Sequence, residues 1–102
     1  MVSDLATLQR EDRRLVILRT LAEDTDYSLN TSILQTVLTS YGHGVGRDVV
    51  DGDVQWLAEG GLVTVDQLAG GRVTVATLTG HGLDVSQGVA RHPGVRRPRP
   101  GA

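Results

Sequence analysis

Residues 46–82 decide the fold, and they read GRDVVDGDVQWLAEGGLVTVDQLAGGRVTVATLTGHG. Apolar residues at helical spacing predict a helix over 47–59, which a pair of glycines ends. Two β-rich runs, 62–68 and 72–78, flank an Ala-Gly-Gly turn and predict a hairpin. Thr79 is a residue type that caps helices, so another helix of about ten residues is predicted to follow it. This part of the chain is therefore predicted to form a helix, then a hairpin, then a second helix.

Two further helices are predicted before this stretch. The first covers 4–24, with Ser3 as its cap, and the second covers 31–41, with Asn30 as its cap. Between them, Tyr27-Ser28 is predicted to form a short strand against the hairpin. The apolar face of the second helix is predicted to comprise Ile33, Leu34, Val37, Leu38 and Tyr41.

The third helix is predicted to place Trp56 in the core, between that helix and the sheet. Val49 lies seven residues earlier on the same helix face. In the first helix, the polar run 9–14 (QREDRR) is interpreted as a solvated face with local charge pairs. The adjacent run 15–18 (LVIL) carries more apolar surface than one small domain is expected to bury. A homodimer through the first helix, the fourth helix or both is therefore predicted.

The charge of the 102-residue chain is unevenly distributed. Residues 1–90 hold six Arg and all twelve acids, and residues 91–102 hold four Arg, no acid, three Pro and two Gly. The sequence therefore predicts a domain over 1–90 and a basic, Pro/Arg-rich flexible tail over 91–102. Such asymmetry is typical of contact with nucleic acid, and also of a solvated end. No signal peptide or membrane span is recognised, so a cytoplasmic location is expected.

Catalysis and metal binding are not expected. The sequence has no Cys, no nucleophile elbow and no phosphate-binding loop. The three histidines, His43, His81 and His92, fall in turn-like or tail segments and are interpreted as surface residues. Asp48 and Asp51 share a helix face but Asp53 points elsewhere, so capping and solvation explain these acids better than a cation site. No cofactor is expected.

Two phrases resemble winged helix-turn-helix proteins. VQWLAEGGLVTV (54–65) resembles the phrase in which a helix ends in Leu, an acid and Gly before the first wing strand, and VATLTGHGL (75–83) resembles the Leu-Thr-x-x-Gly phrase before the next helix. Together with EDRRLVILRTLAED (11–24), they resemble a family of small Mu-like phage and prophage proteins often labelled ArsR-type regulators. The resemblance implies a mainly α fold with a small β-hairpin, in the order α-(β)-α-α-β-β-α.

The resemblance also implies that helix 47–59 reads DNA and that 69–72 is the wing tip. The predicted DNA-binding residues are Arg47, Gln55, Arg72, Arg91, Arg96, Arg97 and Arg99. Arg and Gln are suited to guanine and adenine, whereas Asp48 and Asp51 on the same helix would repel phosphate. Two functions stay open: a DNA-binding phage regulator, and a non-enzymatic protein-interaction module with an accessory or packaging role in the phage.

Overall fold

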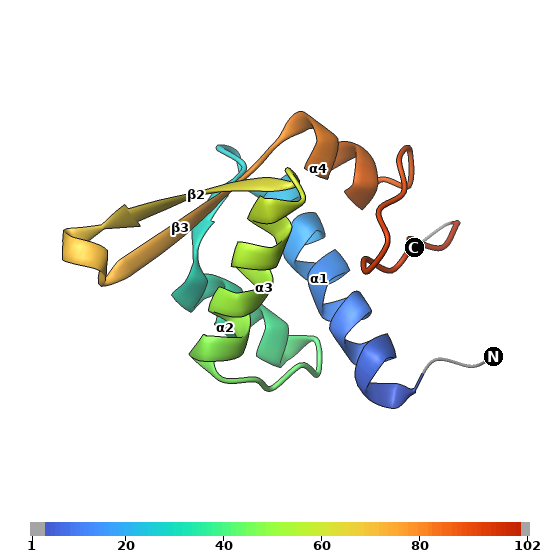
Figure 1. The fold of residues 1–102 in the computed structure, drawn as a ribbon, viewed down its shortest axis with the longest axis horizontal. Helices are drawn as coiled ribbons and strands as arrows, with labels where there is room; N and C mark the ends of the chain where they lie inside the picture. The colour runs from blue at the N-terminus through green and yellow to red at the C-terminus, as the bar shows by residue number, and fades with distance from the viewer. Residues whose placement is uncertain (1–3, 101–102) are drawn as a thin grey trace.

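Four helices and a small sheet surround the core in the computed structural model, which describes residues 4–100 (Figure 1). α1 (Leu5–Glu23) begins at Asp4, whose Oδ1 accepts a hydrogen bond of 2.8 Å from the Thr7 backbone N–H. A carboxylate is a good cap because it satisfies one of the free amides of the first turn. The predicted cap, Ser3, lies outside the described residues.

α2 (Thr31–Ser40) begins where the sequence predicted. The Asn30 side chain accepts a hydrogen bond of 2.8 Å from the Ile33 N–H. Leu34 and Leu38 are buried, but Ile33 is 46% exposed and Tyr41 is 63% exposed. The predicted inward face was therefore too wide, because only the narrow stripe that faces α1 and α3 finds a partner.

α3 (Arg47–Glu59) has the predicted bounds and buries Val50, Val54 and Leu57. Gly61, with φ of +76°, lets the chain reverse into the sheet. The predicted position of Trp56 was wrong. Trp56 is only partly buried, and it faces α1 and the C-terminal segment instead of the sheet, as its contacts below show.

The sheet is antiparallel, and β3 is its central strand. β2 (Val63–Leu68) and β3 (Val73–Leu78) pair from Val63 with Leu78 to Leu68 with Val73. The short β1 (Ser28–Asn30) pairs with the other edge of β3 and starts one residue later than predicted. A tight turn, η1 (Ala69–Gly71), closes the hairpin with φ of +52°, +69° and +88° at its three residues. The hairpin projects away from the helices (Figure 1).

α4 (Gly80–Ser86) is capped by Thr79 as predicted, but it is shorter than the expected ten residues. The Thr79 Oγ1 accepts a hydrogen bond from the Gly82 N–H at 3.0 Å and lies 2.8 Å from the carbonyl oxygen of Gly61. Gly88 follows with φ of +78°, a conformation that ends a helix readily in glycine.

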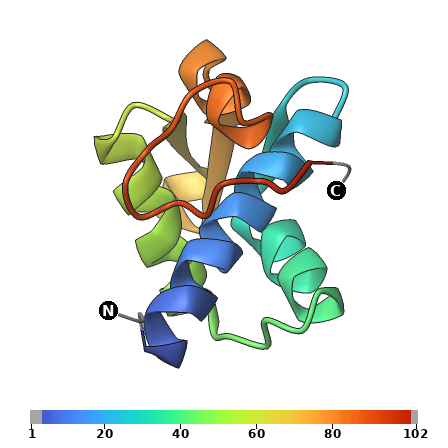
Figure 2. The same cartoon turned by 90° about the vertical axis from the view of Figure 1, so that its right-hand side faces the viewer.

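Residues 91–100 form no helix or strand, in keeping with their Pro and Gly content, but they are not detached from the body. They run across α1 (Figure 2). Val95 is buried, and the Arg96 N–H donates a hydrogen bond of 3.2 Å to the carbonyl oxygen of Glu11. These two contacts are among those that hold the segment against α1, whereas the sequence predicted a flexible tail.

One chain buries the apolar run of α1 by itself. Leu15, Ile17 and Leu18 are almost fully inaccessible, and Val16 packs against the same core. The segment 91–100 covers part of α1, which the sequence argument for a dimer did not include. The apolar run 15–18 therefore does not call for a second copy of the chain.

Gly82 is the tightest point of the fold. A Cβ at Gly82 would lie 2.0 Å from the carbonyl oxygen of Leu62, so any side chain there must push α4 away from the backbone that precedes β2. Gly80, in the same helix, has nothing within 4 Å of its Cβ position. Substituting these two glycines therefore distinguishes the effect of steric contact on stability from the effect of helix propensity.

We predict that Gly82→Ala lowers the free energy of unfolding by roughly 3 kcal/mol, because backbone cannot yield as a flexible side chain does. Gly80→Ala should be neutral or stabilising by up to about 1 kcal/mol. Urea denaturation of both variants measures the difference. Equal midpoints would mean that α4 does not pack on Leu62.

Candidate nucleic-acid interface

α3 leaves one strip of its surface open to solvent. The exposed residues of this strip, called the α3 strip below, are Arg47, Asp48, Asp51, Gly52, Gln55 and Glu59. The α3 strip therefore carries one cation and three anions. Hydrogen-bond donors and acceptors are available to a partner along the whole strip, but its net charge is negative.

The two predicted base-reading residues both lie on the α3 strip. Arg47 is held at the α2 side, where its Nε donates a hydrogen bond of 3.0 Å to Oε1 of Gln35. Gln55 is exposed two turns further along the helix. The fold thus brings these two residues onto one face, as helical spacing predicted.

The tip of the hairpin carries the third predicted residue, Arg72. Its Nε donates a hydrogen bond of 2.9 Å to the carbonyl oxygen of Ala69, so the side chain folds over the turn. Beside it, Leu68 and Val73 form an exposed cross-strand pair. The tip therefore offers one cation and a small apolar patch.

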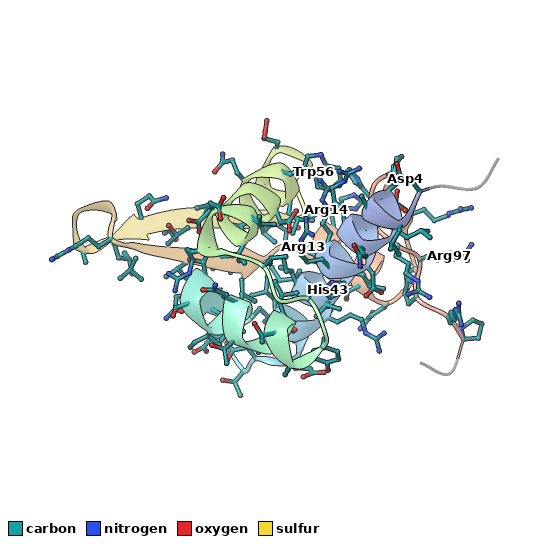
Figure 3. All side chains as sticks on the ribbon, turned by 90° about the horizontal axis from the view of Figure 1, so that it is seen from below. Asp4, Arg13, Arg14, His43, Trp56 and Arg97 are labelled. Atoms are coloured by element: carbon teal, nitrogen blue, oxygen red, sulfur yellow. The ribbon has the colours of Figure 1, made fainter. Side chains whose placement is uncertain are left out.

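The four predicted tail cations lie elsewhere. The C-terminal segment and the hairpin tip are at opposite ends of the molecule, and Arg97 lies far from the hairpin (Figures 1 and 3). Arg96 is engaged within the protein, since its Nη1 lies 2.8 Å from Oδ1 of Asp12. The seven predicted residues therefore divide into an α3 and hairpin group and a separate C-terminal group.

A buried charge cluster anchors α3 from behind. Asp53 is only 4% exposed and accepts hydrogen bonds from Arg13, whose Nη2 lies 3.1 Å from Oδ1 and whose Nε contacts Oδ2. Arg14 Nε also contacts Oδ1, at 3.4 Å. The polar run of α1 was interpreted as a solvated face with local pairs, and this interpretation was wrong for Arg13 and Arg14. We call Arg13, Arg14 and Asp53 the Asp53 cluster.

Trp56 extends the Asp53 cluster to the C-terminal segment. The guanidinium carbon of Arg14 lies 3.8 Å from the centroid of the Trp56 ring, a cation–π geometry. Arg14 Nη1 donates a hydrogen bond of 3.1 Å to the carbonyl oxygen of Gly94, and the His92 ring meets Trp56 edge-on. Burial lowers the pKa of Arg14, and Asp53 offsets part of that effect.

A second ion cluster joins α1 to two other segments. His43 Nε2 lies 2.7 Å from Oδ2 of Asp12, while Arg96 binds the other oxygen of the same carboxylate. Burial raises the pKa of Asp12, but the hydrogen bonds and charges of His43 and Arg96 lower it by more, so it lies below its ordinary value. Asp12 therefore ties the α2–α3 turn and the C-terminal segment to α1.

Two of the three histidines differ from the surface residues that the sequence predicted. His43 is paired with Asp12, and His92 packs on Trp56, while His81 is exposed. Within residues 4–100, no three His, Cys, Asp or Glu side chains come together as a metal site. The same part of the chain contains no helix both long and apolar enough to cross a bilayer.

Comparison with known proteins identifies the family. The chain is 55% identical over 102 residues to the "Uncharacterized protein gp26" of Escherichia phage Mu, covering both chains completely. It is 44% identical over 69 residues to an "Uncharacterized protein" of Haemophilus influenzae, covering 68% of this chain and 66% of the relative. No family model matches the chain. The protein therefore belongs to a Mu-like phage family that includes gp26, as the sequence resemblance predicted.

We predict that Asp53→Asn lowers the free energy of unfolding by roughly 3 to 5 kcal/mol, because it leaves two largely buried guanidinium groups without their counter-charge. Asp51→Asn removes an equal charge from the exposed side of the same helix and should change stability by less than about 0.5 kcal/mol. Chemical denaturation compares the two variants. Similar losses of unfolding free energy in the two variants would show that the buried contacts of Asp53 with the arginines do not account for its effect on stability.

The lowered pKa of Asp12 predicts a contribution to acid stability. A carboxyl with a depressed folded-state pKa stabilises the fold above its ordinary value of 3.8, and this stabilisation is lost as the pH falls below that value. Wild type and Asp12→Asn should therefore differ most near neutral pH and converge as the pH drops through 3.8 toward 2. Denaturant midpoints across pH 2–7 measure this, with Asp66→Asn in the hairpin as the control. A constant difference would contradict the assignment.

Proposed function

We propose that the protein is a winged-helix DNA-binding protein without enzymatic activity. In this proposal α2 and α3 form the helix-turn-helix, α3 enters the major groove, and the hairpin of β2 and β3 is the wing. The observation that supports it most is the element order, in which the exposed α3 strip is followed directly by a projecting hairpin that pairs with β1 (Figure 1). The ArsR-type label belongs to the same proposal.

The roles of individual residues follow from their positions. Arg47 and Gln55 are placed to meet base edges, and Arg72 at the hairpin tip is placed to meet phosphate or the minor groove. Arg is the side chain best suited to guanine, and Gln to adenine. A phage regulator of this kind acts on duplex DNA in the cytoplasm of the bacterial host.

The acidic α3 strip sets the expected strength of binding. Asp48, Asp51 and Glu59 face the same side as Arg47 and Gln55 and oppose the approach of phosphate. Nonspecific affinity through this face should therefore be low, and discrimination should depend on the few base contacts. Sequence preference, more than tight binding to random duplex, is the expected signature.

The same strip supports a second candidate, a protein-interaction module. Ile33 in α2 and Tyr41, the residue that ends this helix, are exposed, so apolar side chains and carboxylates are both available on the surface. A homodimer also stays a prediction, and the exposed apolar residues that support it are Leu5 and Leu8 in the first turns of α1 and Val89 after α4. A phage protein or a second copy would then take the place of DNA.

We predict that Arg47→Ala weakens binding to a preferred duplex by about 1 to 3 kcal/mol and leaves random duplex nearly unchanged. Asp51→Asn should strengthen binding to random duplex, whereas Asp26→Asn, in the turn after α1, should not. Duplexes selected from a random pool and measured by fluorescence anisotropy provide the test. Absence of binding at low salt, without rescue by Asp51→Asn, would favour the protein-interaction module.

A further inference from the structure

A basic groove lies at the end of the molecule opposite the hairpin. Its walls come from the last turns of α1, the end of α4 and the C-terminal segment, and the open space between them has a volume of about 830 Å³. Arg19, Arg97 and Arg99 line it, and Glu23 is the one acid among the lining residues. We call this feature the Arg19 groove.

The cations of the Arg19 groove have no partner within the described chain. Over residues 4–100, the ion pairs with Asp and Glu involve Arg13, Arg14, Arg96 and His43, and they leave the three groove arginines unpaired. Three guanidinium groups facing one open space repel one another unless an anion is bound. The groove is therefore suited to a ligand with several negative charges.

The C-terminal segment builds part of this groove. Gly88 has no side chain, and a Cβ there would lie 3.4 Å from Cγ of Pro98, so Pro98 closes on the end of α4. Val95, buried further back, fixes the start of the segment. Arg97 and Arg99 consequently extend from an anchored backbone, and Arg19 faces them from α1.

The chemistry of the lining indicates which polyanion fits. No aromatic side chain lines the Arg19 groove, so it offers no platform for stacked bases. Guanidinium groups bind phosphate through two parallel hydrogen bonds. Three guanidinium groups close together favour a partner of high charge density, and duplex DNA carries one charge per roughly 1.7 Å.

We propose that the Arg19 groove is a second DNA-binding surface that holds the phosphodiester backbone of a duplex segment other than the one on α3. The C-terminal segment that forms one wall of the groove and the tip of the hairpin are at opposite ends of the molecule (Figures 1 and 3), so the Arg19 groove is separate from the wing. One molecule then bridges two segments. This inference rests on the proposed DNA binding by α3, but the groove itself is tested separately.

The first experiment is a salt series with a random duplex and full-length protein. Each lost phosphate contact reduces the slope of log affinity against log salt by about 0.9, so the triple variant Arg19→Gln, Arg97→Gln, Arg99→Gln should flatten it by about 2.7. Arg10→Gln, an exposed cation outside the groove, should leave the slope unchanged. An unchanged slope in the triple variant, with thermal unfolding equal to wild type, overturns the proposal. Equal competition by polyglutamate also overturns it, in favour of an acidic protein partner.

The second experiment measures bridging. Protein captured on an immobilised preferred duplex should retain a second, labelled random duplex, and the triple variant should lose this retention while still binding the first. If Arg47→Ala leaves capture on the preferred duplex unchanged while the triple variant still flattens the salt slope, the α3 site fails and the Arg19 groove stands. If wild type never retains a second duplex, both surfaces serve one segment and the bridging role is overturned.

Discussion

A single buried carboxylate, Asp53, holds α3 against α1. Removing a charge from water is costly unless opposite charges and hydrogen bonds replace the lost hydration. Asp53 meets that requirement with Arg13 and Arg14, which belong to α1. Because Arg14 also binds the carbonyl oxygen of Gly94, the same charge cluster orients the C-terminal segment. One charge cluster thus joins α1, α3 and the C-terminal segment.

This arrangement explains why residues after α4 are part of the fold. Gly94 has φ of +91°, and a Cβ there would lie 2.7 Å from the Trp56 ring. Only glycine combines this backbone conformation with so close an approach to the indole. The segment therefore packs over Trp56, and Val95 enters the core directly after it. The apolar run 15–18 of α1 is therefore buried within one chain.

The parts of the fold that the sequence predicted are those with local causes. Asn30 and Thr79 are caps whose side chains bond within three residues, and the hairpin turn follows from its glycines. The Asp53 cluster has no such local signal, since Arg13 and Arg14 lie 40 and 39 residues from Asp53 in the sequence. Asp12 and Arg96 are 84 residues apart. Periodicity indicates which side of a helix is polar, but it does not show that a charged residue distant in the sequence packs against that side.

The same distinction applies to the candidate site. Exposure of Arg47 and Gln55 on one face of α3 follows from helical spacing, and the structure has them there. The separation of the tail cations from that face depends on where the C-terminal segment packs. The prediction from composition therefore grouped into one DNA-binding set residues that the fold places on two separate surfaces. Glycines such as Gly82 and Gly94 were recognisable as turn or motif residues, but the contacts that require them were not.

Asp48, the acid in the first turn of α3, also has a physical reason apart from any partner. The first turn of a helix carries free N–H groups and a partial positive charge, which attract anions. Gly46 caps α3 without a side-chain hydrogen bond, and a carboxylate oxygen of Asp48 lies 2.6 Å from the position of a Cβ on Gly46. Asp48 therefore occupies the region where a phosphate would otherwise bind. If α3 meets DNA, its N-terminus cannot serve as the phosphate site, and the side chains of Arg47 and Gln55 must provide the contact that the backbone does not.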